Sequence, residues 1–229
     1  MSKHLIQRGD NFFLRYQRNG RERYTQIRTG DFLLIDETGC KCSCKGLFLC
    51  FLGSCIKCCS DSKYTHVGMI IIDPTFGPVP LKGAYFLQST GLDKIRDVED
   101  NQQKFGVQLD RLDQALDEIH GHVYYRKVHV ERNAEFYRHL SFAHSVVHNR
   151  PYDDNPIDWV KSLFDDKKGR VHKKKTFFCS ALVSYMLASI GVMAMDTDWT
   201  IIRPKDLGSE PGHRFSQFMC NVDREIKVF

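Results

Sequence analysis

A cysteine and a histidine are the residues of this 229-residue chain best placed to do covalent chemistry. Cys179 falls one or two residues into a predicted helix, where unpaired backbone N–H groups favour an anion such as a thiolate. His66 opens the most strongly β-prone run of the chain, and histidine is the usual base for a thiol near neutral pH. A thiolate beside an imidazole can attack a carbonyl carbon. Either residue alone is more often structural, so the chemistry depends on the fold bringing them together.

Two further polar residues are candidates for the same site. Gln88 closes the predicted strand that follows the His66 strand, where its side chain could accept a hydrogen bond from the imidazole and fix its tautomer. Tyr152 lies in the stretch Arg150-Pro151-Tyr152-Asp153. We expect Tyr152 either to line the cleft or to be an ordinary core tyrosine.

The elements that must position these residues follow from apolar spacing and turn signals. Asn19-Gly20 between two β-prone runs predicts a hairpin. The predicted strands are 12–16, 23–27, 32–35, 66–72, 84–88, 107–111 and 122–130. A short helix is predicted at 112–117 and amphipathic helices at 134–148 and 178–190, the last ending at Gly191. Strands first and helices late favour an α+β fold.

Six short motifs occur in one order along the chain. They are G-D-F-L-L-I at 30–35, T-H-V-G-M-I at 65–70, F-L-Q-S-T at 86–90, R-P-Y-D at 150–153, F-F-C-S-A-L-V at 177–183 and R-P-K-D-L at 203–207. This order resembles the circularly permuted papain-like hydrolases of the NlpC superfamily, in the YiiX/YaeF-like branch that includes small poxvirus proteins. The resemblance implies one domain over 1–229, with an antiparallel sheet packed against the helix that carries the cysteine. An N-terminal hairpin extension (about 1–28) and a Cys-rich insertion (40–59) are expected to flank that core.

The resemblance also implies roles for the candidate residues. Cys179 would be the nucleophile, His66 the general base and Gln88 the orienting residue. Many relatives hold glutamate at the Gln88 position, and a neutral amide stabilises an imidazolium less than a carboxylate does. The implied function is a cysteine hydrolase or acyltransferase that forms a thioester from a peptide or lipid amide or ester, without a cofactor. The alternative is an inactive member of the fold that acts as a structural or membrane-associated binding protein, including one in a virion.

Cysteines are concentrated in one segment, with seven of the nine between Cys40 and Cys59. Three interpretations stay open: an S-acylated loop that touches a membrane, a thiolate metal site, or an inert loop. The metal alternative would use Cys55, Cys58, Cys42 and Cys44. A basic run at 167–175 is either a solvated surface or a contact for an anionic membrane.

Composition excludes several classes of protein. Apolar residues make up 42% and charged residues 27%, which is ordinary globular composition and excludes a fibrous or wholly disordered chain. A net charge of +5, from 33 basic and 28 acidic residues, is too small to indicate nucleic-acid binding. The polar N-terminus has no secretory signal pattern and no run is apolar enough to span a bilayer. We therefore expect a cytoplasmic or intracellular membrane-associated protein, possible in a virion and not secreted.

Overall fold

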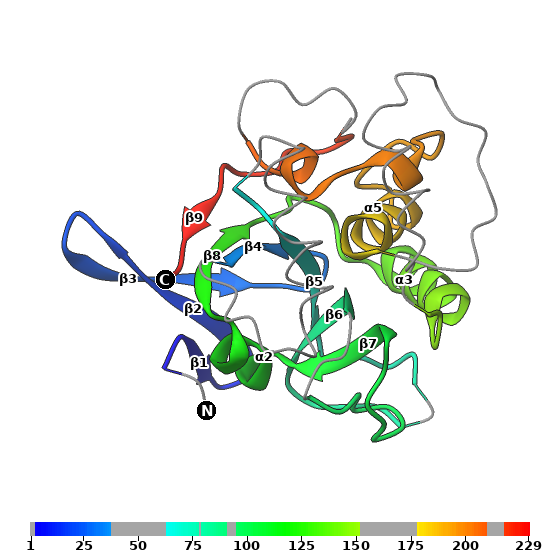
Figure 1. Ribbon diagram of the computed structural model, residues 1–229, viewed down its shortest axis with the longest axis horizontal. Coiled ribbons are helices and arrows are strands. Elements are labelled where there is room, and N and C mark those ends of the chain that lie inside the picture. The colour runs from blue at the N-terminus through cyan, green and yellow to red at the C-terminus, as the bar shows by residue number, and fades with distance from the viewer. Residues whose placement is uncertain (1–2, 38–62, 78, 91–94, 152–177, 210–217) are drawn as a thin grey trace, which may run out of the picture.

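The computed structural model describes residues 3–37, 63–77, 79–90, 95–151, 178–209 and 218–229. Over these residues the fold is α+β, as expected, with antiparallel sheets and helices on their faces (Figure 1). The strands of the larger sheet are β4 (Phe32–Glu37), β5 (His66–Ile72), β6 (Ala84–Thr90), β7 (Gly106–Arg111), β8 (Gly121–Arg126) and β9 (Ile226–Lys227). Their order across the sheet is β7-β6-β5-β4-β8-β9, and every neighbouring pair is antiparallel.

Two long helices cover one face of this sheet. The helices α3 (Ala134–Val147) and α5 (Cys179–Ser189) lie side by side in Figure 1, and α5 contacts both β5 and β6. Val67, Met69 and Ile71 alternate along β5 toward these helices and form a core with Leu182 and Leu187. The prediction that α5 is amphipathic is wrong, because nine of its eleven residues are buried. A helix enclosed by a sheet, α3 and the 3-10 helix η1 (Trp199–Ile201) has no solvent face to keep polar.

The other face of the sheet is covered by the N-terminal segment and α2 (Leu112–Glu118). The predicted hairpin is confirmed as β2 (Asn11–Arg18) and β3 (Arg21–Ile27), and both turn residues, Asn19 and Gly20, have positive φ. A further strand, β1 (Leu5–Arg8), was not predicted and makes this a three-stranded sheet. The apolar side of this small sheet packs into a second hydrophobic core, on the face of the larger sheet opposite α3 and α5. It contributes Leu5, Phe12, Leu14 and Ile27.

Two differences from the predicted elements have a common cause near the C-terminus. The predicted strand 122–130 leaves the sheet after Arg126, and the two-residue strand β9 was not predicted. Beyond Arg126 the chain pairs with the C-terminal segment instead, through the isolated bridge between Val128 and Val222. The Arg126 guanidinium reinforces this by donating to the carbonyl oxygens of Leu207 and Asp223 at 2.6 and 2.8 Å. Such pairing between distant segments leaves no periodic signal in sequence.

Asp31, which immediately precedes β4, ties several segments together. Its fully buried carboxylate accepts hydrogen bonds from the Tyr125 hydroxyl at 2.6 Å, the Val128 backbone N–H at 2.9 Å and the Arg132 guanidinium at 3.0 Å. Burial raises the pKa of Asp31, and these hydrogen bonds act in the opposite direction. Asp31, in the G-D-F-L-L-I motif, therefore anchors the start of β4, the strand between β5 and β8.

Among the described residues, no helix is long and apolar enough to cross a membrane.

Replacing Asp31 by asparagine is expected to lower the free energy of unfolding by about 3–5 kcal/mol, because it leaves the Arg132 charge buried without its carboxylate. Chemical denaturation measures this loss. The matched variant Asp113→Asn removes a more exposed pair with Arg111, 3.2 Å away, and is expected to cost less than about 1 kcal/mol. Equal losses in the two variants would contradict the anchoring role of Asp31.

Candidate active site

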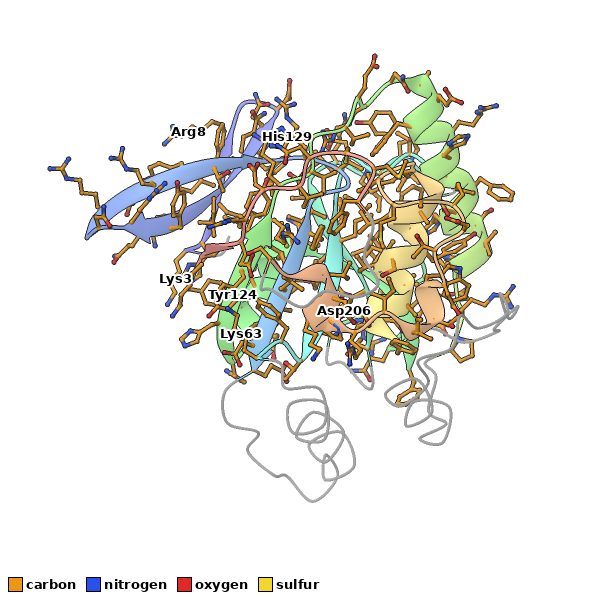
Figure 2. All side chains as sticks on the ribbon, turned by 90° about the horizontal axis from the view of Figure 1, so that it is seen from above. Lys3, Arg8, Lys63, Tyr124, His129 and Asp206 are labelled. Carbon is orange, nitrogen blue, oxygen red and sulfur yellow. The ribbon has the colours of Figure 1, made fainter. Side chains whose placement is uncertain are left out.

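His66 is held at the start of β5 by close packing on the next strand. It pairs with Ile35 of β4, and its half-buried ring meets the Phe86 ring edge-on at a centroid distance of 6.5 Å. A Cβ at Gly68 would lie 2.3 Å from the Phe86 ring, so only glycine leaves room for that ring to pack against β5 at this position. Just before the strand, the Lys63 Nζ lies 5.0 Å from the centroid of the Tyr124 ring (Figure 2). The glycine of the T-H-V-G-M-I motif thus positions the histidine.

Cys179 is the first residue of α5 and is 5% exposed. The N-cap Phe178 makes no side-chain capping bond, so the first N–H groups of the helix present their partial positive charge beside the thiol. The helix start is fastened by the Ser180 hydroxyl, which donates to the Ile202 carbonyl at 2.6 Å. Ile202 is followed by the 3-10 helix η2 (Pro204–Leu207). The Asp206 carboxylate of η2 accepts a hydrogen bond from the backbone N–H of the N-cap residue Arg203 (Figure 2). The R-P-K-D-L motif therefore supports the cysteine.

The fold brings Cys179 and His66 together. Burial alone would lower the pKa of His66. The negative charge of a Cys179 thiolate, its hydrogen bond with the ring and the hydrogen bond to Gln88 outweigh that effect and raise the pKa to about 9. A protonated imidazole beside Cys179 is therefore favoured at neutral pH.

Gln88 also lies in this site, and it connects His66 to a buried carboxylate. Its Oε1 lies 2.7 Å from the His66 Nε2, and its Nε2 donates to the Asp110 Oδ2 at 2.6 Å. The Gln108 amide donates to the same Asp110 oxygen at 2.9 Å. His66, Gln88 and Asp110 stand on the adjacent strands β5, β6 and β7, so one line of polar side chains crosses the sheet.

The order of donors and acceptors along this line fixes the histidine tautomer. A carboxylate only accepts hydrogen bonds, so the amide nitrogen of Gln88 must face Asp110 and its oxygen must face His66. An amide oxygen also only accepts, so the His66 Nε2 must carry a hydrogen. The remaining nitrogen, Nδ1, is then the one available for the hydrogen bond with Cys179.

Asp110 is the site residue that sequence reasoning missed. It is fully buried and lies on β7, which was predicted as the strand 107–111. Gln108 and Asp110 are two residues apart on β7 and both buried, an unusual polar pattern for a strand. That pattern was the available signal, but only the pairing of β6 with β7 shows what Asp110 contacts.

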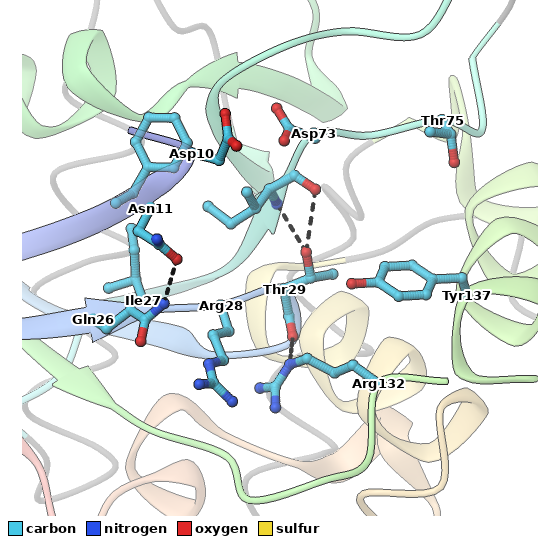
Figure 3. Close-up of a pocket in the computed structure, with 12 residues that line it drawn as sticks. Asp10, Asn11, Gln26, Ile27, Arg28, Thr29, Asp73, Thr75, Arg132 and Tyr137 are labelled. Atoms are coloured by element: carbon cyan, nitrogen blue, oxygen red, sulfur yellow. Dashed lines mark hydrogen bonds between the residues drawn. The ribbon is translucent and has the colours of Figure 1, made fainter. Parts of the chain in front are cut away.

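Several predicted features lie outside the described residues: Tyr152, the cysteine segment with Cys42, Cys44, Cys55 and Cys58, and the basic run at 167–175. A hollow of about 600 Å³ is found elsewhere, at the far end of β5 beside Ile72 (Figure 3). Thr29, Arg132 and Tyr137 line it. Neither Cys179 nor His66 borders this hollow, so it is a feature separate from the Cys–His site.

Comparison with known proteins gives a distant structural similarity. No family model matches the chain, and no curated protein matches it. Among solved structures it is similar to metalloprotein yiiX from Escherichia coli O157:H7, with a TM-score of 0.43 and 17% sequence identity. The similarity covers 71% of this chain and 66% of that one, so the chain spans slightly under two thirds of its neighbour's length.

Replacing Asp110 by asparagine tests the line of hydrogen bonds. Asparagine offers an NH₂ as well as an oxygen, so the Gln88 amide is free to turn over and present its own NH₂ to His66. The ring hydrogen then moves to Nδ1, which can no longer take the Cys179 proton. We expect alkylation of Cys179 near neutral pH to slow about tenfold or more. We also expect its flat pH profile below about 9 to become a steady rise with pH.

The shape of the profile is the decisive readout for this variant. A purely structural role for Asp110 would lower stability and slow the alkylation equally at every pH, leaving the profile flat. That outcome would contradict the role given to the carboxylate.

Proposed function

We propose that the chain is a cysteine hydrolase or acyltransferase with the permuted papain-like arrangement, acting on an amide or ester bond of a peptide or lipid. The observation that carries the proposal is the His66 ring, which contacts Cys179 and is held through Gln88 by Asp110. The order of the pair along the chain, histidine on an early strand and cysteine on a late helix, also supports the permuted arrangement.

In the proposed reaction the Cys179 thiolate attacks the carbonyl carbon, forming a C–S bond and an oxyanion. The oxyanion collapses and breaks the bond to the leaving amine or alcohol, which takes its proton from the Nδ1 of His66. The resulting thioester is attacked by water or another acceptor. His66, now neutral, accepts the proton of that nucleophile, and the acyl group leaves as the thiolate is regenerated.

Negative charge that develops on the oxyanion needs a donor close to the cysteine. The backbone N–H of Cys179 belongs to the first turn of α5, whose N–H groups have no partner within the helix. This N–H is the proposed first oxyanion donor. The helix N-terminus would thus favour both the attacking thiolate and the oxyanion that follows.

The Gln88 amide bears directly on the inactive alternative. A neutral glutamine stabilises an imidazolium less than a glutamate does. By itself this difference favours a binding protein without turnover. Here the carboxyl group of Asp110 accepts a hydrogen bond from the Gln88 amide at 2.6 Å, which polarises the amide and strengthens its oxygen as an acceptor for His66. We therefore prefer the catalytic proposal. Contact of the cysteine segment and the basic run with a membrane stays a prediction.

Reactivity toward iodoacetamide should separate Cys179 from Cys220. Cys220 is half-buried, and burial raises the pKa of its thiol, whereas Cys179 is less exposed but paired with His66. We expect Cys179 to be alkylated far faster near neutral pH, despite its lower exposure, and His66→Ala to slow its alkylation. Peptide mass spectrometry resolves the two sites. Equal rates at the two cysteines would mean that Cys179 is an ordinary thiol.

Turnover is tested with activated acyl esters and with peptide amides, in separate assays. We expect the wild type to release product from at least one class and to carry the acyl group on Cys179, seen as an added mass on the intact protein. Cys179→Ser should abolish both signals, because a serine hydroxyl is far less acidic than a thiol. A reactive Cys179 that forms no acyl adduct with either class would favour the binding protein instead.

A further inference from the structure

A second cluster of reactive side chains lies outside the Cys–His site. Glu99, in the connection between β6 and β7, meets His144 and His148 at the C-terminal end of α3. The Oε2 of Glu99 is 3.0 Å from the Nε2 of His144 and 3.2 Å from the Nδ1 of His148. All three ligand-type atoms lie within 4.8 Å of one another. Two ring nitrogens and a carboxylate oxygen thus converge on one point.

The helix supplies two of these groups by simple periodicity. Residues four apart along a helix lie on the same face, so His144 in the last turn of α3 and His148, its C-cap residue, project together. Phe76 stacks on the His144 ring at a centroid distance of 3.8 Å and an angle of 24°, which fixes the plane of that ring. The ring orientation is therefore set by packing and does not depend on Glu99 alone.

The third group is held just as firmly. The Glu99 backbone N–H donates to the Asp97 Oδ1 at 2.7 Å, and the Val98 N–H donates to the Leu109 carbonyl of β7 at 2.9 Å. Lys104 also binds the buried Asp97 carboxylate, at 2.6 Å. The connection is thus fastened to the edge of the sheet on both sides of Glu99, which presents a preorganised carboxylate to the helix.

The two distances from the Glu99 oxygen to the histidine nitrogens are close to those in a tetrahedral metal site. Zinc bonds of about 2.0–2.2 Å to nitrogen and oxygen place neighbouring ligands about 3.3 Å apart, close to the two distances observed. The side chains of Glu99 and His144 are each 5% exposed, whereas that of His148 is 34% exposed. Solvent therefore reaches the cluster from the His148 side, where a water molecule would complete the coordination.

We propose that Glu99, His144 and His148 form a binding site for a divalent transition-metal ion, with zinc the best match to two imidazoles and a carboxylate. The ion fastens the end of α3 to the connection that leads into β7. This inference does not depend on the proposed acyl transfer, since none of its three ligands contacts Cys179, His66 or Gln88 in the hydrogen bonds that the described residues form.

The test is metal binding by the full chain after removal of bound metal with a chelator. Wild type, Glu99→Gln and His148→Ala are titrated with zinc by calorimetry. We expect each variant to bind one zinc equivalent fewer than the wild type, and zinc to raise the unfolding temperature less. The matched control is His139→Ala, which removes an exposed histidine from the same helix and should behave as wild type.

The seven cysteines between Cys40 and Cys59 are themselves possible zinc ligands, so a second measurement separates the two sites. Cobalt bound by nitrogen and oxygen gives visible d–d bands without the near-ultraviolet charge-transfer band of a cobalt–thiolate bond. We expect such thiolate-free bands in the wild type and in His139→Ala, and their loss in both ligand variants. Equal zinc stoichiometry and unchanged cobalt spectra in all four proteins would overturn the proposal and leave a metal-free His–Glu–His hydrogen-bond cluster.

Discussion

The hydrogen bond between the Gln88 amide and the Asp110 carboxylate is the constraint on which the candidate site depends. An amide alone can turn either its oxygen or its nitrogen toward a histidine, and only one orientation leaves Nδ1 ready to exchange a proton with the cysteine. The carboxylate removes the choice, because it accepts only the NH₂ side at 2.6 Å. Asp110 thereby decides which nitrogen of the His66 ring carries the hydrogen that faces Gln88.

The antiparallel sheet places hydrogen-bond donors next to the buried Asp110 carboxyl group. The register of β6 on β7 sets Gln88 directly opposite Gln108 and diagonal to Asp110, within reach of both side chains. Burying a carboxylate is costly unless it is hydrogen-bonded, and two amides donate to the same oxygen here. The remaining end of the line, His66, is positioned by Gly68, where a larger residue would collide with Phe86. Local sequence and sheet register therefore act together on one ring.

Much of the fold could be predicted from the sequence because it rests on local signals. Asn19-Gly20 specifies its turn, the apolar run at 32–35 forms the buried strand β4, and Gly191 follows α5 with a positive φ. What failed depends on contacts between distant segments. Asp110 joins the site only through strand pairing, and Glu99 meets His144 from 45 positions away. The burial of nine of the eleven residues of α5 likewise reflects its contacts with the sheet, α3 and η1, which its own apolar pattern does not specify.

The central claim is that contact with Cys179 holds His66 in its protonated form. It is tested most directly by following the ring carbon and nitrogen resonances of His66 by NMR as the pH is raised, in the wild type and in Cys179→Ser. The account predicts that His66 stays protonated up to about pH 9 in the wild type and loses its proton at a much lower pH in the serine variant. The same titration midpoint in both proteins would contradict it.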